Sequence, residues 1–229
     1  MGGVVSQFIN DFWPVPVIHE MIRIFPDALF WGIGILALVT LSLPYGVFFG
    51  SLVEALGIYH IIRTANNSLG IVDAKRGSAD RGCKTGFTGT TLQSVSLFDE
   101  ASQIPFPSSH IFMISFISSY ILSIIVAFKD ELVILDETYG ESYKTRIYFS
   151  VAAFTIMMFV TMTYRLFYSC DSFMVILISF IIGVTAGTIV VQQNKMLMGL
   201  ESLNLLGVPI LRKRTASGNE LMVCSSSTT

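Results

Sequence analysis

The sequence predicts an all-α protein, a polytopic membrane helix bundle with four or five transmembrane helices. Of its 229 residues, 52% are hydrophobic and only 13% are charged, and the mean hydropathy is +0.67. A soluble domain of this size carries about 25% charged residues. Several long apolar segments with almost no charge account for the difference. The chain is therefore expected to be a multi-pass integral membrane protein whose main partner is the lipid bilayer.

Three segments in the second half of the chain are predicted to cross the membrane. A helix needs about 20 apolar residues to span the hydrocarbon core, where unsatisfied backbone groups are costly. Residues 111–128, 147–167 and 173–191 meet or approach that length, and polar residues bound each of them.

Residues 28–62 are too long for a single span. They contain Leu43-Pro44-Tyr45-Gly46, a natural place for a break or a tight turn. We predict two helices that meet near Pro44. The first would be short for a full span, and the second carries Glu54 and His60, so one tilted helix followed by a re-entrant or interfacial helix is the alternative.

These segments divide the chain into three parts. Residues 1–26 mix aromatic and aliphatic residues with a few charges, which predicts an interfacial N-terminal segment, and Pro14 and Pro16 argue against a continuous helix there. Residues 27–193 form the transmembrane helical domain, with a long polar loop at 63–107. Residues 194–229 are expected to be a flexible C-terminal tail, with Arg212-Lys213-Arg214 as a membrane-flanking anchor or part of a kinase site.

The first six residues, Met1-Gly2-Gly3-Val4-Val5-Ser6, match the pattern for N-myristoylation. In this pattern Gly2 is acylated after the initiator methionine is removed. Lipidation at Gly2 would place the N-terminus in the cytosol of a eukaryotic host. A short start without a lipid is the alternative.

Charge and cysteine content exclude some classes and leave the orientation open. The net charge is −2 without an extended block of one sign, so no nucleic-acid partner is expected. Cys83, Cys170 and Cys224 lack metal-type spacing, and no metal or cofactor is predicted. The predicted helix order places Cys83 and Cys170 on one side of the membrane, where they could pair or stay free. Basic residues in the 63–107 loop and in the tail compete for the cytoplasmic side.

Two further patterns allow alternative interpretations. Gly183 and Gly187 lie four residues apart in the last span, which permits close helix approach inside the protein or in a dimer. Asn66-Asn67-Ser68 is a glycosylation sequon, but it follows an apolar helix so closely that we do not expect it to be used.

The most specific local signal is Phe106-Pro107-Ser108-Ser109-His110, at the start of a predicted span. Proline sets the turn, and the serines can cap a helix whose N-terminal amides favour anions. His110 could then protonate a leaving oxygen of a phosphate held there. A helix cap followed by an interfacial histidine is the alternative interpretation.

This Pro-Ser-Ser-His run resembles the second motif of the type 2 phosphatidic acid phosphatase family, usually Pro-Ser-Gly/Ser-His at the start of a membrane helix. Helix order and spacing from Pro107 to Gly187 are similar to the family's core, and the resemblance covers roughly residues 28–192. It implies a phosphatase-like core with His110 as general acid. It also implies phosphate binding by Ser108, Ser109 and Arg165. The family's first motif, Lys-x6-Arg-Pro, is not matched, because Lys75 precedes Arg81 by the wrong spacing and Gly82 replaces the proline. Arg81 and Lys84 could still bind phosphate as cations or belong to a solvated basic loop.

The chain departs from that family where the nucleophile is expected. In the third motif a histidine stands six residues after the arginine, and here Asp171 follows Arg165 at that distance. No histidine follows His110, and the orienting aspartate is replaced by Val175. Asp171 could act as a carboxylate nucleophile or be an ordinary helix N-cap. Arg165 could bind phosphate or simply extend to the membrane interface.

Three functions are compatible with these patterns. The first is a phosphatase-like core that is catalytically inactive and has a structural or assembly role, for example in a viral membrane with other membrane or capsid proteins as partners. The second is an active lipid phosphatase or phosphotransferase that acts on a lipid phosphate with His110 as general acid. The third is a small channel, suggested by Glu54 and His60. Whether the chain is an enzyme is left open, and the missing histidine favours the first hypothesis.

Overall fold

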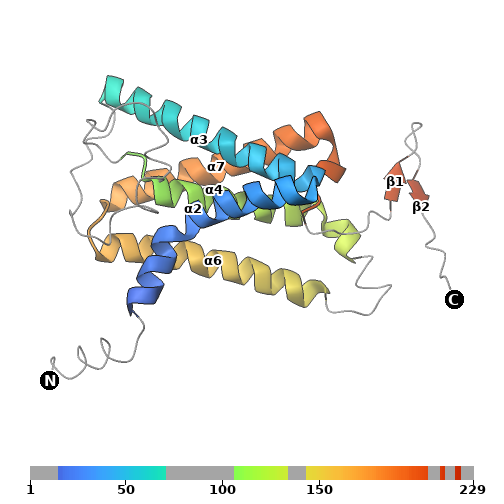
Figure 1. The fold of residues 1–229 in the computed structure, drawn as a ribbon, viewed down its shortest axis with the longest axis horizontal. Helices are drawn as coiled ribbons and strands as arrows, with labels where there is room; N and C mark the ends of the chain where they lie inside the picture. Colours follow the sequence, from blue (N-terminus) through green and yellow to red (C-terminus); the bar gives the residue numbers. More distant parts are fainter. Residues whose placement is uncertain (1–14, 71–105, 134–142, 206–211, 215–219, 223–229) are drawn as a thin grey trace.

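A computed structural model describes residues 15–70, 106–133, 143–205, 212–214 and 220–222 (Figure 1). Five long helices form a bundle in which they run roughly along one axis. A short 3-10 helix, η2, and two short strands, β1 and β2, follow the bundle. The bounds are α2 Val15–Thr40, α3 Leu43–Leu69, α4 Ser109–Ala127, α6 Tyr143–Phe167, α7 Phe173–Met198, η2 Leu200–Leu203, β1 Arg212–Arg214 and β2 Glu220–Met222.

Four of these helices are long and apolar enough to cross a membrane, which agrees with the predicted helical, multi-pass architecture. They are α3, α4, residues Ile147–Phe167 of α6, and α7. The apolar part of α2, Ile24–Thr40, is shorter than the other four. The sequence expectation that the first of two helices in residues 28–62 would be short is confirmed.

The break between α2 and α3 falls where Pro44 predicted it. Leu41 has a positive φ of 49°, which turns the chain sharply after α2. Ser42 is the N-cap of α3, and Pro44 lies in its first turn, where the missing N–H has no intrahelical role. The two helices then pack side by side, with the rings of Phe30 and Phe49 5.2 Å apart.

The expectation that Pro14 and Pro16 prevent a continuous helix in residues 1–26 is wrong for the part that the structure describes, from Val15 onward. Helix α2 begins at Val15 and includes both Pro16 and Pro26. Pro16 lies in the first turn, where a proline removes no intrahelical hydrogen bond. Pro26 lies inside the helix, and α2 changes direction along its N-terminal half (Figure 1). Pro14 lies outside the described residues.

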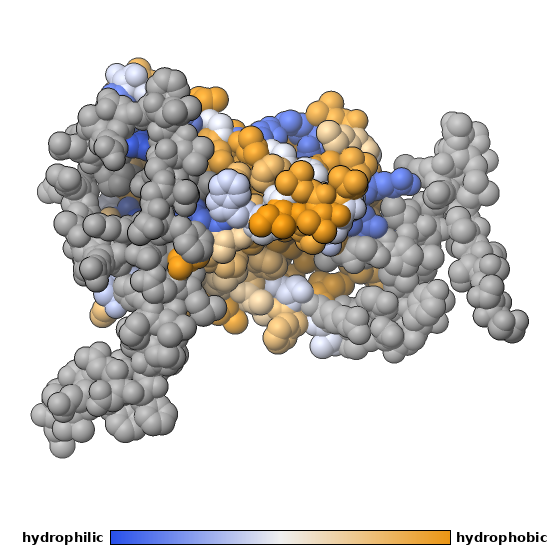
Figure 2. Space-filling model, in the orientation of Figure 1, coloured by the Kyte–Doolittle hydropathy of each residue, from blue (hydrophilic) through white to orange (hydrophobic). Residues whose placement is uncertain are grey.

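Helix α4 is the central helix and α6 the peripheral one. Within their apolar windows, 72% of α4 is buried but only 6% of α6. The exposed positions of α6 include large apolar side chains such as Phe149 and Phe159. Figure 2 likewise shows apolar residues gathered on the middle of the visible face, where α2 lies in front. Such surfaces are costly in water and suit contact with lipid tails.

The two glycines of the last span bring α7 against α4. A Cβ atom at Gly183 would lie 2.6 Å from the carbonyl oxygen of Phe112. At Gly187 it would lie 2.6 Å from the carbonyl oxygen of Phe116 and 2.1 Å from Ser119 Oγ. Real side chains do not tolerate such distances. Of the two interpretations of this motif, the structure supports packing inside the protein.

Near the other end of the same helix pair, three polar side chains connect α3, α4 and α7. The Asn194 Nδ2 group donates to Ser51 Oγ at 2.8 Å and to the Tyr120 hydroxyl at 3.2 Å. Ser51 donates in turn to the carbonyl oxygen of Val47 at 2.8 Å. All three side chains are buried. Their mutual hydrogen bonds satisfy polar groups that would otherwise be costly among apolar helices.

The last helix extends beyond residue 193, the predicted end of the transmembrane domain. Helix α7 continues past residue 193 to Met198, and η2 follows it. Farther on, β1 and β2 pair in an antiparallel arrangement that places Arg212 opposite Met222. The sequon residue Asn66 is 1% exposed within α3, which agrees with the expectation that it is not glycosylated.

We expect the substitution Gly187→Ala to destabilise the bundle, because the added methyl group must displace the α4 backbone. Overpacking of this kind costs about 1–3 kcal/mol. Thermal unfolding of the purified protein in detergent measures the loss. Gly57→Ala is the matched control, since that helical glycine on α3 has open space around it. Alanine has the higher helix propensity, so this variant should be more stable than the wild type by ~0.5–1 kcal/mol. Equal stability of the two variants would contradict the close-packing account.

Candidate functional site

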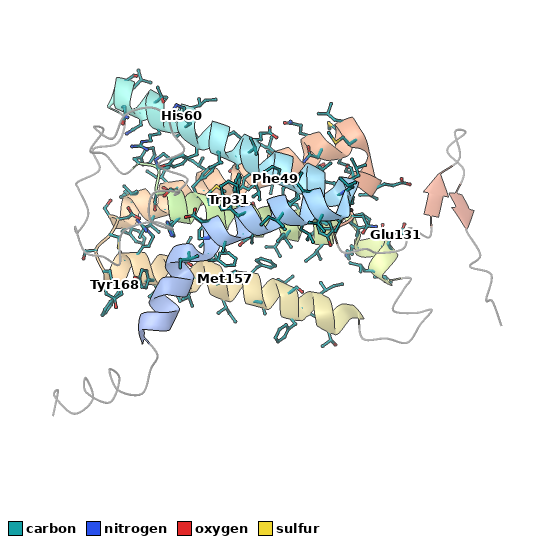
Figure 3. All side chains as sticks on the ribbon, in the orientation of Figure 1. Trp31, Phe49, His60, Glu131, Met157 and Tyr168 are labelled. Carbon is teal, nitrogen blue, oxygen red and sulfur yellow. The ribbon has the colours of Figure 1, made fainter. Side chains whose placement is uncertain are left out.

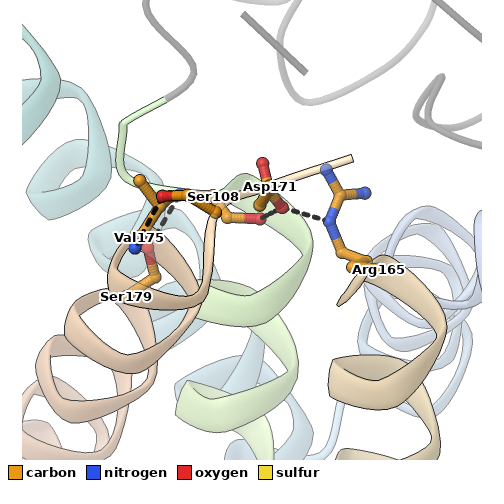
Figure 4. A network of polar contacts seen from close by, with 6 residues as sticks. Ser108, Arg165, Asp171, Val175 and Ser179 are labelled. Atoms are coloured by element: carbon orange, nitrogen blue, oxygen red, sulfur yellow. Dashed lines mark hydrogen bonds and ion pairs between the residues drawn. The ribbon is translucent and has the colours of Figure 1, made fainter. Parts of the chain in front are cut away.

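Three helix ends meet at one end of the bundle and bring polar side chains together. They are the N-terminus of α4, the C-terminus of α6 and the N-terminus of α7 (Figures 1 and 4). Ser108 precedes α4, Arg165 lies in the last turn of α6, and Asp171 lies just before α7. The structure thus joins three of the residues that the sequence analysis singled out.

Asp171 is the centre of this group. Its side chain is fully buried, and the side chain of Arg165 is 8% exposed. Asp171 Oδ2 accepts a hydrogen bond from the Ser108 hydroxyl at 2.7 Å and another from Arg165 Nε, with which it forms an ion pair. Figure 4 shows the carboxylate lying between the serine and the guanidinium group. Asp171 Oδ1 is buried and has no hydrogen-bond partner among the described residues.

The short connection between α6 and α7 produces the ion pair. After α6 ends, Ser169 adopts a positive φ of 52°, and the backbone N–H of Cys170 donates to the carbonyl oxygen of Arg165 at 2.9 Å. This turn folds Asp171 back over the side chain of Arg165. Ser172 then begins α7 as its N-cap, and its hydroxyl accepts from the Val175 N–H at 3.4 Å.

Ser108 is held by both its backbone and its side chain. Its N–H donates to Ser179 Oγ on α7 at 2.8 Å, and its carbonyl oxygen accepts from the N–H of Phe112 in α4. It occupies the N-cap position of α4, but its hydroxyl makes no capping bond. The expectation that this hydroxyl caps the helix is therefore wrong: the side chain is turned toward Asp171, to which its O–H donates, and away from the N–H groups of the first turn of α4.

Two other sequence interpretations are corrected by this geometry. Asp171 is not the N-cap of α7, since Ser172 has that role. Arg165 does not extend outward from the bundle, because the residue is 7% exposed and its side chain is turned toward Asp171. Asp171 pairs with the buried charge of Arg165 and not with the N–H groups of α7, and Arg165 pairs with Asp171 and not with groups at the membrane surface.

The remaining predicted site residues are only partly placed. Ser109 and His110 are buried in the first turn of α4. Arg81, Lys84 and Gly2 lie outside the described residues. Glu54 and His60, on which the channel hypothesis depends, are half-buried on α3. Figure 3 shows His60 on this helix. Within the described part of the chain, no group of three or more His, Cys, Asp or Glu residues could hold a metal ion.

Ser179 is the site residue that the sequence analysis missed. It is 0% exposed and anchors the chain just before α4 through the Ser108 N–H. The only signal in the sequence was a small polar residue seven positions after the N-cap Ser172, on the same face of an otherwise apolar helix. Such a serine can equally bond its own helix backbone.

Cys170 is disulfide-bonded in the structure. The sequence analysis left open whether Cys170 pairs or stays free, and pairing is what the structure has. The other two cysteines, Cys83 and Cys224, lie outside the described residues. The bond sits on the residue next to Asp171, so it holds the same turn that carries the ion pair.

Comparison with known proteins found no matching family model, no similar curated protein and no similar solved structure. The resemblance to the phosphatidic acid phosphatase core therefore stays a prediction from the sequence.

We expect Arg165→Met to destabilise the protein strongly, because it leaves the buried Asp171 carboxylate without its counter-charge. Breaking one half of a buried ion pair costs about 3–5 kcal/mol. The double variant Arg165→Met/Asp171→Leu removes both charges and should recover part of that loss. Thermal unfolding in detergent measures both variants.

Thr163→Val, at an exposed position on the same helix, is the control and should change stability little. A double variant whose loss of stability exceeds the sum of the losses in Arg165→Met and Asp171→Leu would contradict a pairwise interaction.

Proposed function

We propose that this chain is a multi-spanning membrane protein with a phosphatase-like core that is catalytically inactive and has a structural or assembly role. The membrane of a virus, with other membrane or capsid proteins as partners, is one setting that fits. The observation that carries the proposal is the buried Arg165–Asp171 ion pair with its bond to Ser108.

The first support is that the groups expected to bind phosphate already bind one another. The Arg165 Nε–H and the Ser108 hydroxyl both donate to the same carboxylate oxygen, Asp171 Oδ2. The Ser108 N–H donates to Ser179 Oγ. Asp171 thus supplies within the chain the negative charge that a phosphate would bring to this helix end. A phosphate would have to displace it.

The second support concerns the nucleophile. A carboxylate can attack phosphorus only if the phosphoryl group can reach an oxygen atom along the line of the leaving group. Asp171 Oδ2 is occupied by two donors, and Oδ1 is buried. Both oxygens are also shielded from water, so the carboxylate suits a fixed structural role better than attack on a substrate.

The third support is the way in which the polar group joins the helices. Ser108, Arg165 and Asp171 come from three separate helix ends, and Ser179 adds a second contact to α7. The group therefore holds α4, α6 and α7 together at one end of the bundle. A stabilising role of this kind fits a protein that maintains a shape in a membrane rather than one that turns over a substrate.

A phosphate-release assay tests the proposal. The purified wild-type protein, His110→Ala and Asp171→Asn are each given phosphatidic acid and a polyprenyl pyrophosphate in mixed micelles. We expect no release above the protein-free background for any of the three. An active lipid phosphatase in the same micelles serves as the positive control.

Wild-type turnover that disappears in both variants would overturn the proposal and establish the alternative, an active lipid phosphatase with His110 as general acid. Turnover that persists unchanged in both variants would indicate a contaminating enzyme. Thr163→Val prepared in the same way should then release the same amount of phosphate.

A further inference from the structure

We propose that the bundle end that carries Ser108, Arg165 and Asp171 faces an oxidising compartment, and that the C-terminal end of α7 faces the cytosol. This orientation does not depend on whether the core is catalytically active. It rests on the disulfide at Cys170, on the length of α7 and on the arrangement of the four candidate spans.

The disulfide identifies the compartment. Cys170 lies in the turn between α6 and α7, one residue before Asp171, and it is disulfide-bonded. Forming this bond removes two electrons and two protons from a pair of thiols, which an oxidant of the compartment must accept. Such bonds persist in the secretory pathway, outside the cell or in a periplasm, whereas cytosolic thiols are kept reduced. The α6–α7 turn therefore belongs on the non-cytosolic face.

Helix α7 separates that turn from the chain that follows it. It has 26 residues, its apolar 18-residue window has a mean hydropathy of 2.6, and at 1.5 Å per residue the helix is about 39 Å long. The hydrocarbon core of a bilayer is about 30 Å thick. Lys195 and Gly199, near the far end of α7, therefore lie on the opposite face from Cys170, and so does η2.

The other spans agree with this arrangement. Figure 1 shows that α3 ends, α4 begins and α6 ends at the bundle end where α7 begins. With four spans, the start of α3 and the end of α7 share one face, which the proposal assigns to the cytosol.

Charge alone could not make this assignment, because basic residues flank both ends of the spans. Arg63 and Arg165 lie near the disulfide end, and four basic residues between positions 75 and 84 follow α3 in the sequence. At the opposite end, Lys129 and Lys195 are exposed, and Arg212-Lys213-Arg214 follow in the tail. Basic residues near span ends favour the cytosolic side, so charge leaves both orientations open and the disulfide makes the assignment.

The orientation decides which molecules can meet each end. A lipid phosphate near Ser108 and Arg165 would have to come from the non-cytosolic leaflet. The sequence Arg212-Lys213-Arg214-Thr215-Ala216-Ser217 would be within reach of cytosolic kinases and of the anionic cytosolic leaflet.

Single cysteines introduced at the two ends test the orientation in sealed endoplasmic-reticulum microsomes, whose cytosolic face is outside. Ser68→Cys introduces a thiol at the exposed end of α3 on the disulfide side, and Glu201→Cys introduces one at the exposed start of η2. A membrane-impermeant polyethylene-glycol maleimide adds a visible mass step for each thiol it reaches. The wild-type pattern is the baseline for the native cysteines.

We expect Glu201→Cys to gain one step over wild type in sealed microsomes, and Ser68→Cys to gain it only after detergent is added. The reverse pattern, or equal labelling of both variants while a lumenal marker stays protected, would overturn the proposal.

A second measurement tests the disulfide itself. In wild-type protein denatured without a reductant, one of the three cysteines should be labelled, and all three should be labelled after reduction. Cys170→Ser should show two labelled thiols without reduction. Three labelled thiols in unreduced wild-type protein would remove the basis of the proposal while leaving the proposed lack of catalysis untouched.

Discussion

The close approach of α4 and α7 is the constraint on which the rest of the structure depends. Gly183 and Gly187 leave no room for a side chain, so the two backbones touch along their length. That contact makes α4 the central helix, and it also places the start of α7 beside the start of α4. Only then can the Ser108 N–H reach Ser179 and the Ser108 hydroxyl reach Asp171. A larger residue at either glycine would separate the polar groups as well as the helices.

Two polar groups mark the two ends of that helix pair, and they differ in kind. At one end Asn194, Ser51 and Tyr120 form a neutral hydrogen-bonded cluster between α3, α4 and α7. At the other end Arg165 and Asp171 add full charges and connect α6. A buried ion pair stabilises less than its attraction suggests, because both charges lose water. Its value here is geometric, since it fixes which helix ends meet and in what order.

The disulfide at Cys170 and the ion pair at Asp171 lie in the same turn. The turn therefore carries both a covalent and an electrostatic constraint, while α6 itself makes little contact with the bundle and exposes most of its apolar surface. The attachment of α6 thus depends heavily on its C-terminal end. In a bilayer, lipid tails would cover the remaining surface of this helix.

The sequence by itself determined the helical membrane class, the three later spans and the break near Pro44, because length, apolar content and proline act locally. It also identified Ser108, Arg165 and Asp171 as members of one site. Only the tertiary structure decided that these three bond to one another, that Ser179 joins them, and that Gly183 and Gly187 act inside the chain. It also extended α2 to Val15, despite Pro16, and α7 to Met198. The bonds among these side chains and the role of the two glycines depend on which helix lies beside which, and contacts between residues distant in sequence leave no periodic signal in the chain.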